Sequence, residues 1–266
     1  MTELIYIGGY GRSGSTLLES LLARRAGVLA CGEVVSCLRK SVDRGCTCGK
    51  SRLDCEVWGA FYTGPGALEG WTHEALTLAL LDRASGHYAF VVDSSKTAWD
   101  ALGAPFKLRR KLGRRFHLTQ LIRDPRGVCW SNAGGAWKRN ALIKNPFLRH
   151  IRTSIGWWAA NLSCELFGRL YPAQFQRIRY EDLVRSPSCA VEHIFSKLPS
   201  PQEPAQTPGQ VQVASSRHQL FGNFARYRDL GLSEIHADTR WKTAMSPAQR
   251  AFVAAATWPL RRRYGY

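Results

Sequence analysis

The stretch GGYGRSGSTLLES, residues 8–20, follows a short apolar run and opens a second apolar-rich segment. A buried strand, a glycine-rich turn and a helix start are the parts of a loop that cradles a phosphate. Gly9 to Gly14 nearly completes the nucleotide-binding pattern G-x-x-x-x-G-K-[ST], but Ser15 stands where the lysine belongs. Arg12 lies in the turn instead. The sequence therefore predicts an anion-binding loop, and raises the question of which anion it holds without that lysine.

Each part of this loop can help to hold an anion. The glycines let the backbone approach it, and the amides of the helix start point at it with the positive end of the helix dipole. Hydroxyl groups add donors, and the arginine adds a charged fork. The alternative is an ordinary strand–turn–helix whose glycines serve only the turn. The residues expected to take part are Gly11, Arg12, Ser13, Gly14, Ser15 and Thr16.

Composition narrows the class of protein. The 266 residues are long enough to bury a substantial core, and we expect one domain over 1–266. The net charge of +17, from 37 Lys and Arg against 20 Asp and Glu, indicates an anionic partner. A strand beginning near residue 4 leaves no room for a signal peptide, and no apolar run is long enough to span a membrane. We therefore expect a cytoplasmic protein whose eight cysteines are thiols.

The apolar pattern predicts an α/β fold, a central parallel sheet flanked by helices on both faces. The expected strands are 3–8, 89–93, 116–122 and 175–179. The expected helices are 15–26, 72–83, 97–112, 125–137, 152–171, 187–197 and 246–257. Ligands of such sheets bind at the carboxyl ends of the strands. The segment 199–217, rich in Pro, Gln and Ser, is expected to be a flexible loop or a lid.

Two further stretches have the residues of anion sites. In LIRDPRGVCWSN, residues 121–132, Arg123 ends a strand and Ser131 follows eight residues later, two turns into a helix. Both can reach one phosphate, although an Arg–Asp surface pair beside a solvated serine is the plainer interpretation. In RHQLFGNFARYR, residues 217–228, a glycine turn precedes alternating arginines, which is also compatible with a basic surface loop.

Together these motifs resemble those of sulfotransferases that use 3′-phosphoadenosine 5′-phosphosulfate (PAPS), in a style closest to the bacterial and tyrosylprotein-type branch. In that family an R-S-G-[ST]-T loop, matched by residues 12–16, holds the 5′-phosphosulfate. An arginine and a serine eight residues apart, matched by Arg123 and Ser131, hold the 3′-phosphate. The resemblance implies a P-loop-like fold. It also implies a donor without a magnesium-bound triphosphate, so the loop needs no lysine for terminal phosphates.

The resemblance also implies further nucleotide contacts and a set of catalytic residues. Tyr180, in RYEDLV, would lie against the nucleotide. A looser match at the C-terminal end adds Gly222, Asn223 and Arg226. Glu33, in ACGEVVS, matches the family's catalytic base, and Lys96, in VVDSSK, matches a lysine near the transferring group. Arg12 would share the leaving-group charge with Lys96.

Each catalytic assignment has an alternative. Glu33 can be a carboxylate that stabilises the start of a following helix. Lys96 can be a surface lysine, and Asp93 can be the base, although a cap or a pair with Lys96 suits it better. The acceptor is expected to be a hydroxyl of a carbohydrate, glycolipid or small molecule. No metal is required for the transfer itself.

The segment CTCGKSRLDC, residues 46–55, has a zinc-like composition but not a standard spacing of ligands. A fourth ligand would have to be Cys31 or Cys37. We interpret the segment instead as a loop whose thiols pack near Trp58. His218, beside the third motif, is expected to have a structural role.

Two other functions remain open. A P-loop small-molecule kinase is disfavoured by the missing lysine and by the lack of a clear magnesium-binding aspartate. A role in binding nucleic acid or membrane would explain the positive charge, but such a role does not require three separate anion motifs. The basic run FKLRRKLGRR, residues 106–115, is read as a solvated helix face, with contact to an anionic membrane as its alternative. We expect no nucleic-acid partner.

Overall fold

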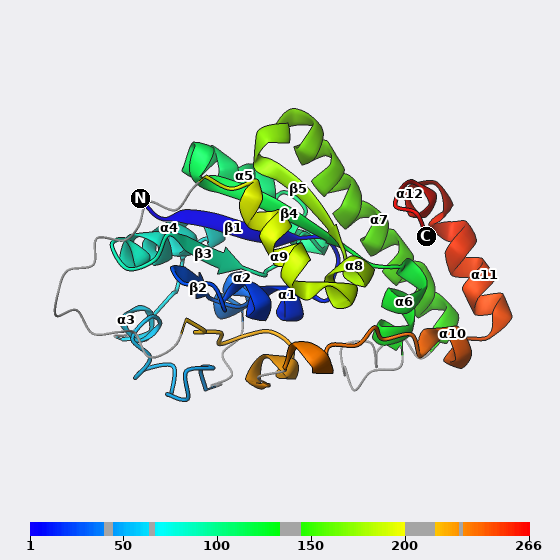
Figure 1. Cartoon of the computed structure of the whole chain (residues 1–266), viewed down its shortest axis with the longest axis horizontal. Helices are drawn as coiled ribbons and strands as arrows, with labels where there is room; N and C mark the ends of the chain where they lie inside the picture. Colours follow the sequence, from blue (N-terminus) through cyan, green and yellow to red (C-terminus); the bar gives the residue numbers. More distant parts are fainter. Residues whose placement is uncertain (40–44, 64–66, 134–144, 200–215, 229–230) are drawn as a thin grey trace.

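The computed structural model describes residues 1–39, 45–63, 67–133, 145–199, 216–228 and 231–266. These residues form one five-stranded sheet in which every paired neighbour is parallel. Its order is β2-β3-β1-β4-β5 (Figure 1). The strands are β1 (Glu3–Gly8), β2 (Val28–Ala30), β3 (Phe90–Asp93), β4 (Phe116–Ile122) and β5 (Phe175–Arg179). The predicted parallel sheet is thus confirmed.

Helices cover both faces of the sheet, so the side chains of its central strands are buried on both sides. From β1, Leu4 and Tyr6 join a core with α4, α5 and α7, while Ile5 and Ile7 join a second core with α1, α8 and α9. The helices are α1 (Ser15–Leu22), α2 (Val34–Cys37), α3 (Gly59–Tyr62), α4 (His73–Ala84), α5 (Ala104–Leu112), α6 (Pro125–Ala133), α7 (Pro146–Leu170), α8 (Tyr180–Arg185), α9 (Pro187–Ser196), α10 (Trp241–Ala244), α11 (Pro247–Ala256) and α12 (Trp258–Arg263). Among the described residues, no helix is both long and apolar enough to cross a bilayer.

The helix expected over 97–112 is wrong in its first half. Lys96 and Trp99 have left-handed backbone angles, with φ of 70° and 52°. Such residues cannot continue an α-helix, so only a short 3₁₀ turn, Trp99–Ala101, precedes α5. Strained backbone of this kind concentrates at functional sites.

Other boundaries differ by smaller amounts. The first helix ends at Leu22 rather than 26, and α7 begins at 146 rather than 152. The strand β2 was not predicted, because a strand of three residues is too short to show an alternation of apolar and polar residues. The end of the helix expected over 125–137 lies outside the described residues beyond Ala133.

The segment expected as a loop over 199–217 lies mostly outside the described residues, which resume at 216. There the chain pairs with the edge of the sheet. The backbone N–H of Ala30 donates to Ser216 O at 2.8 Å, and that of His218 donates to Ala30 O at 2.8 Å. The segment then continues beside β2 and α1 (Figure 1), so it approaches the loop that carries Glu33.

Candidate active site

A pocket of about 500 Å³ lies at the carboxyl ends of the strands, where the first loop, the strand-end arginine and the C-terminal segment meet. Most of the residues singled out from the sequence line it. They are Gly11, Arg12, Gly14, Ser15, Thr16, Glu33, Lys96, Arg123, Ser131, Tyr180 and Asn223. Ser13, Gly222 and Arg226 are not among the described residues that line it. The geometry therefore gathers segments from nearly the whole chain around one cavity.

The first loop has a backbone that admits only glycine at two places. Gly9 has φ of +102°, and a Cβ there would lie 2.4 Å from Leu121 O. Gly14, the residue before α1, has φ of +98°, and a Cβ there would lie 2.7 Å from the Tyr180 ring. Tyr180 thus packs directly against the loop.

The loop also holds a polar atom that the protein leaves unused. Ser13 Oγ is buried and has no hydrogen-bond partner among the described residues. A buried hydroxyl without a partner costs free energy of about 1–3 kcal/mol. Ser13 does not line the pocket, so the loop residues placed to meet an anion there are Gly11, Arg12, Gly14, Ser15 and Thr16.

Arg12 and Arg123 bring two guanidinium groups to one wall of the pocket. Arg12 has a left-handed backbone, with φ of 70°, and its Nε donates to Ser131 Oγ at 2.9 Å. Burial and, second, the charge of Arg123 lower the pKa of Arg12. Arginine nevertheless stays charged at neutral pH. An anion between the two guanidinium groups would relieve their mutual repulsion.

Arg123 is held rigidly from several sides. It is only 5% exposed, and its guanidinium stacks over the Tyr180 ring at 4.4 Å. Its Nη1 donates to Arg12 O at 3.1 Å and its Nη2 to Asp238 O at 2.9 Å. The solvated surface pair considered from the sequence is therefore wrong for Arg123, although Asp124 does pair with Arg126 at 2.5 Å.

Asp238 is a pocket residue that sequence reasoning missed. Its carboxylate lies 3.4 Å from Arg123 Nη2 and accepts from Arg240 Nε at 2.8 Å. The bond from Arg240, together with the charge of Arg123, lowers the pKa of Asp238. A carboxylate thus sits beside the guanidinium that is predicted to read a phosphate. No motif surrounds Asp238 in the sequence, so no local signal pointed to it.

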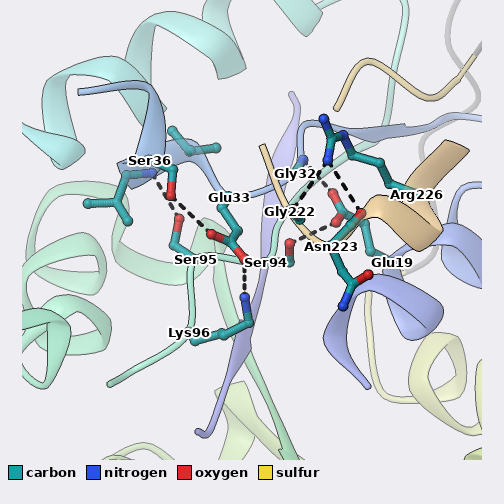
Figure 2. A network of polar contacts seen from close by, with 12 residues as sticks. Glu19, Gly32, Glu33, Ser36, Ser94, Ser95, Lys96, Gly222, Asn223 and Arg226 are labelled. Atoms are coloured by element: carbon teal, nitrogen blue, oxygen red, sulfur yellow. Dashed lines mark hydrogen bonds and ion pairs between the residues drawn. The ribbon is translucent and has the colours of Figure 1, made fainter. Parts of the chain in front are cut away.

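Glu33 and Lys96, which also line the pocket, form an ion pair (Figure 2). Lys96 Nζ donates to Glu33 Oε1, and Ser36 Oγ donates to Glu33 Oε2 at 3.0 Å. Glu33 precedes α2, but its carboxylate makes no capping bond to the helix backbone. Both side chains are more than four-fifths buried, with 18% and 14% exposed. Lys96 is therefore not a surface lysine. Glu33 does stand at the start of α2, as the alternative interpretation expected, but its carboxylate bonds to Lys96 and Ser36 instead of the helix backbone.

Asp93 has partners that leave it no catalytic freedom. It is fully buried and accepts from Ser95 N at 2.8 Å and Ser95 Oγ at 2.5 Å. His73 Nε2 lies 2.7 Å from its other oxygen. The expected cap is found, because Asp93 Oδ1 also accepts from the backbone N–H of Val34 at the start of α2, at 3.4 Å. The alternative pair with Lys96 is wrong, because Asp93 pairs with His73.

Glu19 is a second residue that the sequence analysis missed. It is buried in α1 and accepts from Gly32 N at 2.6 Å and from Ser94 Oγ at 2.7 Å (Figure 2). Burial raises the pKa of Glu19 to about 7. It therefore connects the helix of the first loop to the segments that carry Glu33 and Lys96. A carboxylate on the apolar face of a helix was the available signal.

The third motif contributes less to the pocket than expected. Arg226 is fully buried, and its guanidinium donates to Gly222 O at 3.2 Å (Figure 2). It also donates to Tyr227 Oη at 2.7 Å. These bonds shape its own turn rather than the cavity. Gly222 has φ of +147°, and of the described residues of this motif only Asn223 and Ala225 line the pocket.

Comparison with known proteins adds the fold class. The structure is similar to the sulfotransferase domain from the curacin biosynthetic pathway, with a TM-score of 0.57, 19% identity, and 96% of each chain covered. It is also similar to the sulfotransferase domain of the Synechococcus PCC 7002 olefin synthase, with a TM-score of 0.55 and 18% identity over 100% of this chain and 95% of that chain. No family model and no curated protein matches the sequence. The protein thus has the α/β sulfotransferase fold.

Proposed function

We propose that the protein transfers a sulfuryl group from PAPS to a hydroxyl group of an acceptor. The observation that carries this proposal is the meeting of two anion-binding groups and a Glu–Lys pair in one pocket. The similar sulfotransferase domains support it through their shared fold. The pocket volume of about 500 Å³ is also suitable for a nucleotide-sized ligand.

The donor's two anionic ends match two parts of the pocket. The loop 11–16, through its pocket-lining residues Gly11, Arg12, Gly14, Ser15 and Thr16, would hold the 5′-phosphosulfate. Arg123 and Ser131 would hold the 3′-phosphate. A nucleoside triphosphate has no group for this second site, and the loop has no lysine for its terminal phosphates.

The chemistry follows from positioning and charge, as in phosphoryl transfer. Bound PAPS supplies the sulfuryl group and a 5′-phosphate that leaves with the bridging oxygen. Glu33 takes the proton from the acceptor hydroxyl as its oxygen attacks. Lys96 turns from Glu33 to the bridging oxygen, and with Arg12 it stabilises the negative charge that develops there. Releasing the ion pair frees both partners for these roles.

An aromatic wall lies next to the catalytic pair. Tyr10 and Trp99 line the pocket, and their rings meet edge to face at 6.5 Å. Trp99 is 40% exposed, so part of its ring is available to a ligand. Such a surface suits the apolar face of a sugar or another small molecule. The proposed acceptor is therefore a carbohydrate, glycolipid or small molecule that presents its hydroxyl to Glu33.

A side-by-side transfer assay tests this function. Hydroxyl compounds are incubated with sulfur-labelled PAPS without metal, and separately with γ-labelled ATP and magnesium. We expect label only from PAPS, and loss of transfer in Glu33→Gln. Phosphoryl transfer from ATP without sulfuryl transfer would instead establish the kinase alternative.

A further inference from the structure

Four potential metal ligands gather away from the active-site pocket. They are Cys46, Cys48, Cys55 and His218, and their ligand atoms all lie within 4.8 Å of one another. Cys46, Cys55 and His218 are buried, and Cys48 is half-buried. None of the four has a role in the proposed transfer. We propose that these residues form a structural zinc site.

The distances fit a tetrahedral ion. With Zn–S of about 2.3 Å and Zn–N of about 2.0–2.1 Å, tetrahedral ligands lie about 3.8 Å apart for two sulfurs and about 3.5 Å apart for sulfur and nitrogen. The Sγ atoms of Cys46 and Cys55 are 3.6 Å apart. His218 Nδ1 lies 3.2 Å from Cys55 Sγ and 4.0 Å from Cys46 Sγ. For these three ligands, a zinc ion at the centre would require shifts of about 0.5 Å or less from the tetrahedral distances. Cys48 completes the set, whose ligand atoms lie within 4.8 Å of one another, and its sulfur would have to move inward by up to about 1 Å.

The local backbone is shaped to present the cysteines. Gly49 follows Cys48 with φ of +87°, and it donates to Cys46 O at 3.0 Å. The backbone N–H of Cys46 donates to Lys50 O at 2.9 Å. This tight turn places Cys46 and Cys48 side by side, while Cys55 returns from the next turn. The unusual C-x-C spacing is thus compatible with one binding centre.

The ligand set favours zinc over other ions. Three sulfurs and one imidazole suit zinc, whereas magnesium and calcium prefer oxygen ligands. Four protein ligands leave no open position, which is typical of structural rather than catalytic zinc. On binding, the three thiols lose their protons, and the neutral imidazole binds through its lone pair. The site as a whole then carries one negative charge.

The ion would tie together two distant parts of the chain. Residues 46–55 lie beside the segment from 216 to 221, and Thr47 Oγ1 donates to Arg217 O at 2.8 Å. Phe221, three residues beyond His218, accepts from the backbone N–H of Glu33 at 3.0 Å. The zinc site therefore supports the segment that holds Glu33 in place, without contacting the reacting groups.

This proposal differs from the sequence-based interpretation of plain packed thiols. Sequence reasoning sought a fourth ligand in Cys31 or Cys37, which are near in the chain. Trp58 does lie close, since its Nε1 donates to His218 O at 2.5 Å, but that contact helps to place the histidine. His218 reaches the cysteines only because its segment pairs with β2.

Metal analysis of the full chain tests the proposal. Protein expressed with zinc in the medium, and purified under reducing conditions without chelators, should contain about one zinc per chain. X-ray absorption should show three sulfurs at about 2.3 Å and one nitrogen at about 2.0–2.1 Å. Cys55→Ser and His218→Gln should lose most of the zinc, whereas Cys189→Ser, which changes an exposed cysteine in α9, should keep it.

A second measurement covers the case in which those variants do not fold. Wild-type protein stripped by a chelator should melt at a lower temperature, regain its stability with zinc, and show thiolate-to-metal absorption with cobalt(II). Three results would each overturn the proposal. The first is that wild-type protein contains no metal and binds neither zinc nor cobalt(II). The second is that both ligand variants keep the zinc content of the wild type. The third is that Cys46 and Cys55 form a disulfide in protein purified under reducing conditions.

Discussion

Substitution of Arg123 is the most specific test of how the pocket recognises the 3′-phosphate of its ligand. We expect Arg123→Ala to weaken binding of 3′-phosphoadenosine 5′-phosphate far more than binding of adenosine 5′-phosphate. A charge-assisted hydrogen bond is worth about 1.5–3 kcal/mol, which corresponds to about 10- to 150-fold in Kd. Arg123 is 5% exposed, so solvent screens the interaction little.

The comparison of two ligands removes the indirect effects of the substitution. Arg123 also supports Arg12 O and Tyr180, so its loss disturbs the pocket for any nucleotide. That disturbance penalises both ligands and cancels in the difference between them. Titration calorimetry without metal measures both affinities. Arg126→Ala is the matched control, since Arg126 has the same charge but pairs with Asp124 outside the pocket lining.

Two outcomes would refute this reasoning. One is an equal loss of affinity for both nucleotides in Arg123→Ala, which would show that Arg123 does not contact the 3′-phosphate. The other is a loss of similar size in Arg126→Ala, which would show that the effect comes from general positive charge.

Three further predictions concern the Glu33–Lys96 pair, Asp238 and Glu19. Glu33→Gln should keep donor affinity while the transfer rate falls about 10²- to 10⁴-fold. Lys96→Ala should reduce the transfer rate by a comparable factor, and this defect should become smaller with a donor that has a better leaving group. A wild-type transfer rate in Glu33→Gln would show that Glu33 is only a structural carboxylate. Asp238→Asn should tighten the binding of 3′-phosphoadenosine 5′-phosphate in calorimetry, because the substitution removes a negative charge beside Arg123. Weaker binding would instead show that the Asp238 carboxylate helps to bind the nucleotide. Burial raises the pKa of Glu19 from 4.5 to about 7 in the folded chain. Between these two pH values the folded chain binds one proton more than the unfolded chain. The free energy of unfolding should therefore fall by about 3 kcal/mol as the pH rises through that window. Denaturant titrations at pH 5 and 8 should show this fall in wild type and not in Glu19→Gln; an equal fall in both would exclude Glu19 as its cause.

Much of the site was predictable because parallel strands share one edge for their carboxyl ends. The first loop follows β1 and Arg123 follows β4, and these strands pair directly. Their residues therefore meet in space although 110 positions separate them in sequence. Glu33 and Lys96 follow β2 and β3, which are also neighbours. Here local motifs and sheet topology point to the same place.

The remainder depended on contacts that no local pattern encodes. Asp238 and His218 lie in irregular segments, so periodicity says nothing about where they fold. Arg226 looked like a ligand contact because it is basic and follows a glycine, but its turn needs the guanidinium for its own carbonyl groups. The break before α5 arises from two left-handed residues, and neither is a glycine that would have marked it.

The most direct measurement is a calorimetric comparison of two nucleotides on the wild-type chain. We predict that 3′-phosphoadenosine 5′-phosphate binds tightly without any divalent metal, because the pocket offers separate groups for its 5′ and 3′ phosphates. ATP with magnesium should bind weakly, because the loop has Ser15 where a kinase loop has its lysine. Tighter binding of magnesium-ATP than of the bisphosphate would contradict the sulfotransferase proposal and favour a kinase.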